Sequence, residues 1–179
     1  MRNLLLLSVV TTIFFTRISA QDSTSYSFEV GVKSKKYVGF YWENGISAEF
    51  KSPKIINNRV ALGFNLVSSR LGSAFRSAAL PTLEAELSAI YYFRYTKSFQ
   101  PLVRLNAGLA HVNYGSSLFN SLPQNAPLIS LEVGVSYSLP ANLRMVLSGG
   151  YNILSGNGST GLGSVYPIYS QFSLLYKIK

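Results

Sequence analysis

Apolar and polar residues alternate with a period of two in eight segments between Ser25 and Ile178. This period is typical of a β-strand with one apolar and one polar face. The clearest example is segment 82–96, whose apolar positions are Leu83, Ala85, Leu87, Ala89, Tyr91, Phe93 and Tyr95. The pattern predicts strands at residues 25–33, 45–52, 59–71, 82–96, 101–114, 127–139, 143–154 and 168–178.

The links between the predicted strands are alternately long and short. The long links are residues 34–44, 72–81, 115–126 and 155–167, and the short ones are 53–58, 97–100 and 140–142. This alternation predicts an up-and-down barrel with short turns and both termini at one rim and long loops at the other. In an alternative first hairpin, Asn44-Gly45 forms a tight turn, which changes the register of that hairpin alone.

Periodicity alone does not distinguish a membrane barrel from a lipocalin-like barrel or a β-sandwich, whose apolar faces point inward. Three features favour the membrane barrel. Tyrosines lie on the apolar faces, several near strand ends, where aromatic girdles occur. Five of the seven acidic residues fall on polar faces, and those faces are rich in Gly and Ser. We therefore predict the all-β class and an eight-stranded antiparallel up-and-down transmembrane β-barrel.

The first twenty residues have the features of a secretory signal peptide. Met1-Arg2-Asn3 is a basic start, Leu4 to Phe15 is apolar, and Ile18-Ser19-Ala20 offers a small-residue cleavage site. The predicted organisation is a cleaved signal peptide at residues 1–20 and a barrel domain at 21–179. The chain has no Cys, which excludes a lipoprotein, a disulfide framework and a thiolate metal site.

Composition supports a barrel in lipid. Charged residues are 13% of the chain, against about 25% in a typical soluble domain, and aromatic residues are also 13%. Without Arg2 and Arg17, 14 basic residues remain against 7 acidic ones. Basic side chains near an anionic membrane surface are attracted to lipid phosphates. No basic helix or stacking platform accompanies this charge, so nucleic acid is not an expected partner.

The chain resembles the small barrels of the OmpA transmembrane domain and OmpX type. More narrowly, it resembles the outer membrane protein beta-barrel domain proteins of Bacteroidetes. The resemblance rests on Glu43-Asn-Gly-Ile-Ser-Ala-Glu-Phe-Lys-Ser-Pro53, Val60-Ala-Leu-Gly-Phe-Asn65 and Ser68-Ser-Arg-Leu-Gly72. It implies a Gram-negative outer membrane, insertion by the barrel-assembly machinery and no single function. Such barrels often end in an aromatic residue, whereas this chain ends Tyr176-Lys-Ile-Lys179.

The polar faces carry both signs of charge. The interior of an eight-stranded barrel is just wide enough for side chains to fill it, so these charges are expected to pair and plug it. A narrow or gated ion pore is the alternative, and acid/base chemistry or a metal site is disfavoured by the many basic residues. The predicted lumen network is Glu29, Glu49, Glu84, Glu86, Glu132, Lys33, Lys51, Arg94, Arg104, Arg144 and Lys177.

His111 is the only histidine. Some barrels of this type are lipid A deacylases that use a His, a Ser two residues later and a carboxylate. Here His111 is followed by Val112 and Asn113, while Ser116 and Ser117 lie further along. We therefore expect no enzyme, and an interfacial His near the outer rim. No spacing in the chain indicates a metal or a cofactor.

The expected function is that of a monomeric structural or surface-interaction barrel, in contact with outer-membrane lipid. The alternative is a small transport channel, and a lipid A-modifying enzyme is a remote third. The loop residues expected to face lipopolysaccharide or an external partner are Lys35, Lys36, Tyr37, Phe40, Tyr41, Trp42, Arg76, Leu118 and Phe119.

Overall fold

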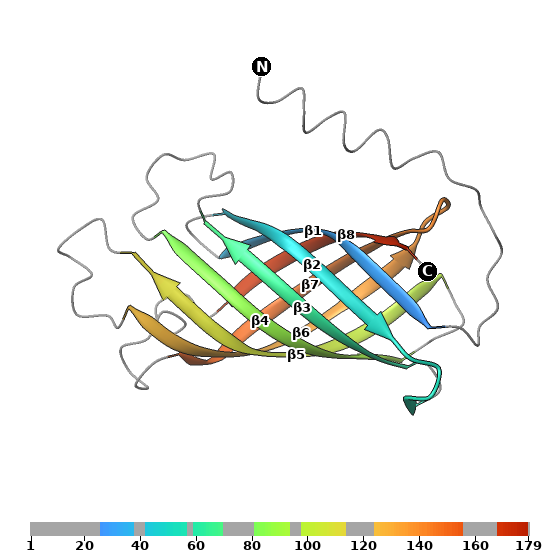
Figure 1. The fold of residues 1–179 in the computed structure, drawn as a ribbon, viewed down its shortest axis with the longest axis horizontal. Helices are drawn as coiled ribbons and strands as arrows, with labels where there is room; N and C mark the ends of the chain where they lie inside the picture. The colour runs from blue at the N-terminus through green and yellow to red at the C-terminus, as the bar shows by residue number, and fades with distance from the viewer. Residues whose placement is uncertain are drawn as a thin grey trace, which may run out of the picture.

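Eight antiparallel strands close into a barrel (Figure 1). The computed structural model describes residues 26–37, 42–56, 59–69, 81–93, 98–113, 124–155 and 168–178. The strands are β1 (Ser27–Tyr37), β2 (Trp42–Lys51), β3 (Val60–Ser68), β4 (Thr82–Tyr92), β5 (Phe99–Val112), β6 (Asn125–Ser138), β7 (Leu143–Ser155) and β8 (Ile168–Lys177). Each strand pairs with its neighbours in sequence, and β8 pairs with β1. The predicted eight-stranded up-and-down barrel is therefore confirmed.

The two rims of the barrel differ in the links they carry. One rim holds links 52–59, 93–98 and 139–142, and here β1 begins and β8 ends, at the right of Figure 1. We call it the turn rim. The opposite rim, which we call the loop rim, holds links 38–41, 69–81, 113–124 and 156–167. Three of its four links are long, in agreement with the predicted alternation.

The first hairpin differs from both predicted versions. Residues 34–44 were expected to form a long loop, with an Asn44-Gly45 turn as the alternative. Instead β1 continues to Tyr37, β2 begins at Trp42, and Gly45 lies within β2 opposite Lys33. The sequence pattern does not reveal these strand ends, because the outward positions there are polar. Ser34, Lys36 and Asn44 interrupt the row of outward apolar residues.

The strands are strongly staggered around the barrel. A line of paired residues runs from Ser27 through Lys51, Ala61, Ile90, Arg104, Glu132, Gly150 and Tyr169, and returns to β1 at Tyr37. From position 27 to position 37 the line has climbed ten residues. Such a stagger tilts the strands against the barrel axis and sets the barrel's width. The diagonal course of the strands is visible in Figure 1.

One irregularity interrupts the pairing. Ile129 pairs with Leu154 and Ser130 with Asn152, so Ile153 has no partner on β6. This is a β-bulge, in which one extra residue on one strand shifts the alternation beyond it. The structure describes the alternation of the β7 side chains from Leu143 to Asn152.

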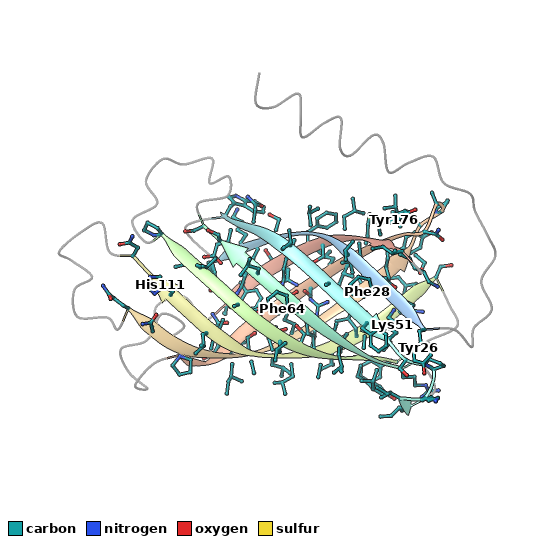
Figure 2. All side chains as sticks on the ribbon, viewed as in Figure 1. Tyr26, Phe28, Lys51, Phe64, His111 and Tyr176 are labelled. Atoms are coloured by element: carbon teal, nitrogen blue, oxygen red, sulfur yellow. The ribbon has the colours of Figure 1, made fainter. Side chains whose placement is uncertain are left out.

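The barrel is apolar outside and polar inside. Leu87, Leu109 and Val133 on β4, β5 and β6 are 67%, 65% and 60% exposed, and side chains of this kind surround the wall in Figure 2. The inward positions of the same strands are buried and mostly polar. The lipocalin-like and sandwich alternatives require the reverse arrangement and are excluded. Within the described ranges, no helix has the length and apolar character to cross a membrane.

An apolar layer lies inside the barrel near the turn rim. Its members pack together as one buried cluster, formed by Ala61, Ile90, Tyr92, Leu102, Val146 and Leu175. Most of this layer cannot be predicted from the sequence. Its inward residues are next to outward residues that are equally apolar, such as Tyr91 and Leu147. Charged residues share this end of the interior with the layer, because Arg144 precedes Val146 on β7 and Lys51 pairs with Ala61.

Candidate functional site

The interior contains every acidic side chain of the described residues. The strand alternation turns Glu29, Glu49, Glu84, Glu86 and Glu132 inward, and Glu43 joins them. None is more than 5% exposed. Because a buried unpaired carboxylate is costly, each requires a cation or a set of hydrogen-bond donors.

Two arginines form the centre of a first group, the arginine cluster, made of Glu29, Glu49, Glu132, Lys51, Arg104 and Arg144. Arg144 donates from Nε to Glu29 at 2.5 Å and from Nη2 to Glu49. Arg104 donates from Nη2 to Glu49 at 2.6 Å and from Nη1 to Glu132 at 3.3 Å. Lys51 lies 3.7 Å from Glu29. Three acids and three bases neutralise one another here.

Tyr92 belongs to the apolar layer and also contacts the arginine cluster. Its hydroxyl donates to Glu49 Oε2 at 3.0 Å and accepts from Arg144 Nη1 at 2.5 Å. The Nζ of Lys51 lies 4.2 Å from the centre of its ring, within the range of a cation–π contact. The ring thus packs with the apolar layer while its hydroxyl binds the charged groups.

A second group, the lysine cluster, lies nearer the loop rim and consists of Lys33, Lys35, Glu43, Glu84 and Glu86. Lys35 Nζ is 2.7 Å from Glu84 and 3.6 Å from Glu86, and Lys33 is 3.5 Å from Glu86. Thr82 donates its hydroxyl proton to Glu43. Lys35 Nζ also lies 4.4 Å from the centre of the Tyr169 ring.

A belt of alternating Ser and Asn side chains runs between the two clusters. It crosses five neighbouring strands through Ser47, Asn65, Ser88, Asn106 and Ser130, with hydrogen bonds of 2.7 to 2.9 Å. Asn65 also donates to Glu86, at 3.5 Å, and Asn106 to Glu132, at 2.7 Å. The belt therefore joins the lysine cluster to the arginine cluster in one hydrogen-bonded network.

Glycines on the inner wall make room for large side chains. A Cβ added at Gly150 would lie 2.2 Å from the Tyr169 ring. That ring packs over Gly150, and its hydroxyl donates to Ser130 at 2.9 Å and to Glu132 at 3.1 Å. Small residues and large polar ones thus fill the interior together.

The predicted lumen residues differ in where they lie. Glu29, Lys33, Glu49, Lys51, Glu84, Glu86, Arg104, Glu132 and Arg144 lie in the two clusters. Lys177 pairs in register with Glu29 and is half-buried. Arg94 lies outside the described residues.

Two residues assigned from sequence to the outer loops lie in the interior instead. Lys35 and Tyr37 are 1% and 2% exposed, because β1 keeps its period-two alternation up to Tyr37. Lys36 and Trp42 are exposed on the outer wall, with Lys36 Nζ 5.0 Å from the Trp42 ring centre. Phe40, Tyr41, Arg76, Leu118 and Phe119 lie outside the described residues.

The sequence did not predict the inward position of Glu43 or the hydrogen bonds of the Ser–Asn belt. Glu43 is two residues before Gly45 and continues the inward series Gly45, Ser47 and Glu49, but the residue falls in a predicted loop. The belt residues occupy polar positions of the period-two pattern. Their contacts across the strands depend on register, which the period alone does not specify.

His111 is exposed on the outer wall near the loop rim (Figure 2). Its Nδ1 lies 2.7 Å from Asn125 Oδ1, and the two residues are direct partners on β5 and β6. Ser116 and Ser117 fall outside the described residues. Among the residues that are described, no three His, Cys, Asp or Glu side chains are arranged to hold a metal ion.

Comparison with solved structures finds the same fold at low sequence identity. The N-terminal β-barrel domain of Pseudomonas aeruginosa OprF matches with a TM-score of 0.58 and 18% identity, over 85% of this chain and 97% of that one. Ail of Yersinia pestis matches with 0.52 and 15%, over 86% and 97%. The outer membrane enzyme PagL matches with 0.50 and 12%, over 84% and 99%.

These likenesses establish the fold only, since the enzyme PagL shares it with barrels that are not named as enzymes. No protein-family model matches the chain, and no curated protein matches it significantly in sequence. The narrower resemblance to the Bacteroidetes group stays a prediction.

Proposed function

We propose that the mature chain is an integral outer-membrane β-barrel of the structural or surface-interaction type. The observation that carries this proposal is the inverted distribution of side chains. Large apolar residues such as Leu87, Leu109 and Val133 are exposed all around the wall, while the described carboxylates are inside. Soluble monomers rarely expose apolar patches larger than a few hundred Å². Bilayer hydrocarbon is the solvent that fits such a wall.

In this proposal residues 1–20 are removed as a signal peptide and the barrel-assembly machinery inserts a monomer. The turn rim, with both ends of the barrel, faces the periplasm. The loop rim faces outward, where its links meet lipopolysaccharide or an external partner. This orientation is the one usual for outer-membrane barrels.

The interior favours a plug over a channel. Both charge clusters and the belt are hydrogen-bonded to one another, and the apolar side chains near the turn rim pack into one cluster. An ion crossing the barrel would have to disrupt these ion pairs, including that of Arg144 with Glu49. We therefore expect no stable conductance.

A lipid A-modifying activity has one observation in its favour. The Asn125 oxygen beside His111 Nδ1 fixes the ring in place, as a catalytic base requires. Against it, position 113 carries Asn, and the described residues provide no carboxylate on the outer wall. An assay for release of acyl chains from lipid A by the purified barrel decides the matter, with His111→Ala as the control.

Fractionation and a heat-shift gel test the membrane proposal. The expressed chain should remain with carbonate-washed outer membranes, begin near Gln21 and migrate differently before and after boiling. Recovery in the soluble periplasm would contradict the proposal. A planar-bilayer recording of the same preparation separates the plug from the channel.

The absence of cysteine allows a clean test of orientation. Asn113 and Asn142 are both exposed, the first at the loop rim and the second at the turn rim. A membrane-impermeant maleimide should label the Asn113→Cys variant in intact cells, and the Asn142→Cys variant only after the outer membrane is permeabilised. The reverse result would invert the orientation.

A further inference from the structure

The exposed charges of the described residues are all positive. The six described carboxylates are in the interior, with 0% to 5% exposure. The charged residues exposed on the outside are Lys36, Lys54 and Arg59. None of the three forms an ion pair within the described part of the chain. The outer surface, as far as it is described, is therefore cationic without a protein counter-charge.

Two of these three cations belong to the turn rim. Lys54 and Arg59 lie in the link between β2 and β3, and half-buried Lys177 lies at the end of β8 on the same rim. Figure 2 shows Tyr26 and Lys51 at this end of the barrel. Lys36 lies apart from them, toward the loop rim, opposite Trp42 in the first hairpin.

Aromatic side chains line the wall next to these cations. Arg59 Nη1 lies 3.5 Å from the hydroxyl of Tyr91, and Tyr91 packs edge-on against Phe93 with ring centres 5.2 Å apart. On the neighbouring strands Tyr26 stacks on Phe50 at 5.9 Å. Aromatic rings of this kind lie at the level of lipid headgroups. The cations next to them are therefore at headgroup depth.

We infer that the turn rim is a binding surface for anionic phospholipid headgroups, which supply the counter-charge that the described residues lack there. The inference rests on the proposed membrane location. A headgroup with net negative charge, such as phosphatidylglycerol, would place its phosphate between Lys54 and Arg59, with its acyl chains along Tyr91 and Phe93. A zwitterionic headgroup carries its own positive group and should therefore bind these cations less tightly. Each basic residue near such a surface favours anionic lipid by about fivefold at most.

A quenching experiment measures this preference at one rim. The full mature chain is folded into phosphatidylcholine vesicles that contain a minority of phosphatidylglycerol. Two vesicle samples are compared, with bromine on the acyl chains as the quencher of tryptophan fluorescence. In one the phosphatidylglycerol is brominated, and in the other an equal amount of the phosphatidylcholine is brominated. The reporter is a Phe93→Trp substitution in a Trp42→Phe background, because Trp42 is the single tryptophan of the chain and lies at the other rim.

Brominated phosphatidylglycerol should quench this reporter about two- to fivefold more than brominated phosphatidylcholine. The double substitution Lys54→Gln/Arg59→Gln should bring the ratio close to one, and so should high salt, which screens exposed charges. The matched control Lys36→Gln removes a cation from the loop rim and should leave the ratio at the turn rim unchanged.

Equal quenching by the two lipids in the reporter protein would overturn the inference, as would a preference that survives the double substitution. Failure of the membrane proposal gives a different result. In that case the chain shows no heat-shifted form in vesicles of any composition, and no quenching ratio can be measured.

Discussion

Arg144 on β7 donates a hydrogen bond to Glu49 on β2, a strand from which β8 and β1 separate it around the wall. The contact therefore crosses the interior. The same guanidinium holds Glu29 on β1 at 2.5 Å. One side chain near the end of the sequence thus binds two carboxylates near its beginning, and these contacts form only when the barrel has closed.

Replacing Arg144 with Met should destabilise the barrel strongly. Glu29 and Glu49 would both lose a buried partner, and breaking a buried pair by removing one member costs about 3–5 kcal/mol. Urea unfolding in vesicles, followed by heat-shift gel, measures the change. The control Lys36→Met removes an exposed cation and should change the unfolding free energy by less than about 0.5 kcal/mol. Equal stability of the two variants would show that the interior charges do not depend on one another.

Arg104 tests which carboxylate depends on which cation. Arg104→Met should be destabilising, and adding Glu132→Gln should recover part of the loss, because within the described residues Glu132 has an ion pair with Arg104 alone. Adding Glu49→Gln instead should recover less, since Glu49 also binds Arg144. The two double variants, compared by unfolding midpoint in the same vesicles, separate these cases. Equal recovery would mean that the pairing is not specific.

The lipid-facing wall should tolerate charge according to depth. Leu83 and Leu87 are outward leucines on the same strand, the first next to the loop rim and the second near the middle. Leu87→Arg should cost about 2–4 kcal/mol and Leu83→Arg about 0–1 kcal/mol, as arginine does at the bilayer midplane and near the interface. The measurement is the folded fraction in vesicles. A barrel in water would show no such gradient, so equal effects would count against the membrane.

Two adjacent glycines offer a matched test of interior packing. Gly150→Ala should destabilise by about 1–3 kcal/mol, because the new methyl group displaces the Tyr169 ring. At Gly149 the nearest atom to an added Cβ is 3.9 Å away, so Gly149→Ala should be neutral or slightly stabilising. Urea midpoints give both values. Adding Tyr169→Ala to Gly150→Ala should relieve the clash.

The period-two pattern was enough to predict the strands, the closed barrel and five of the six inward carboxylates. The pairs within the interior could not be predicted, because Arg144 meets Glu49 through the stagger and the width of the barrel. The assignment of Lys35 to a loop failed for a local reason. Its neighbours Ser34 and Lys36 face outward but are polar, so the alternation that identifies a strand is missing there. The bulge at Ile153 leaves no signal in the composition of β7.

The ten-residue stagger also bears on which insertions and deletions this chain can accept. A residue added within a rim link lengthens that link and leaves every pair along the line from Ser27 to Tyr37 in place. A residue added in the middle of a strand exchanges inside and outside for everything beyond it. Such a change in β4 would carry Glu84 or Glu86 into the hydrocarbon. Changes in length among related barrels should therefore accumulate in the links of the loop rim, while the strands vary by substitution alone.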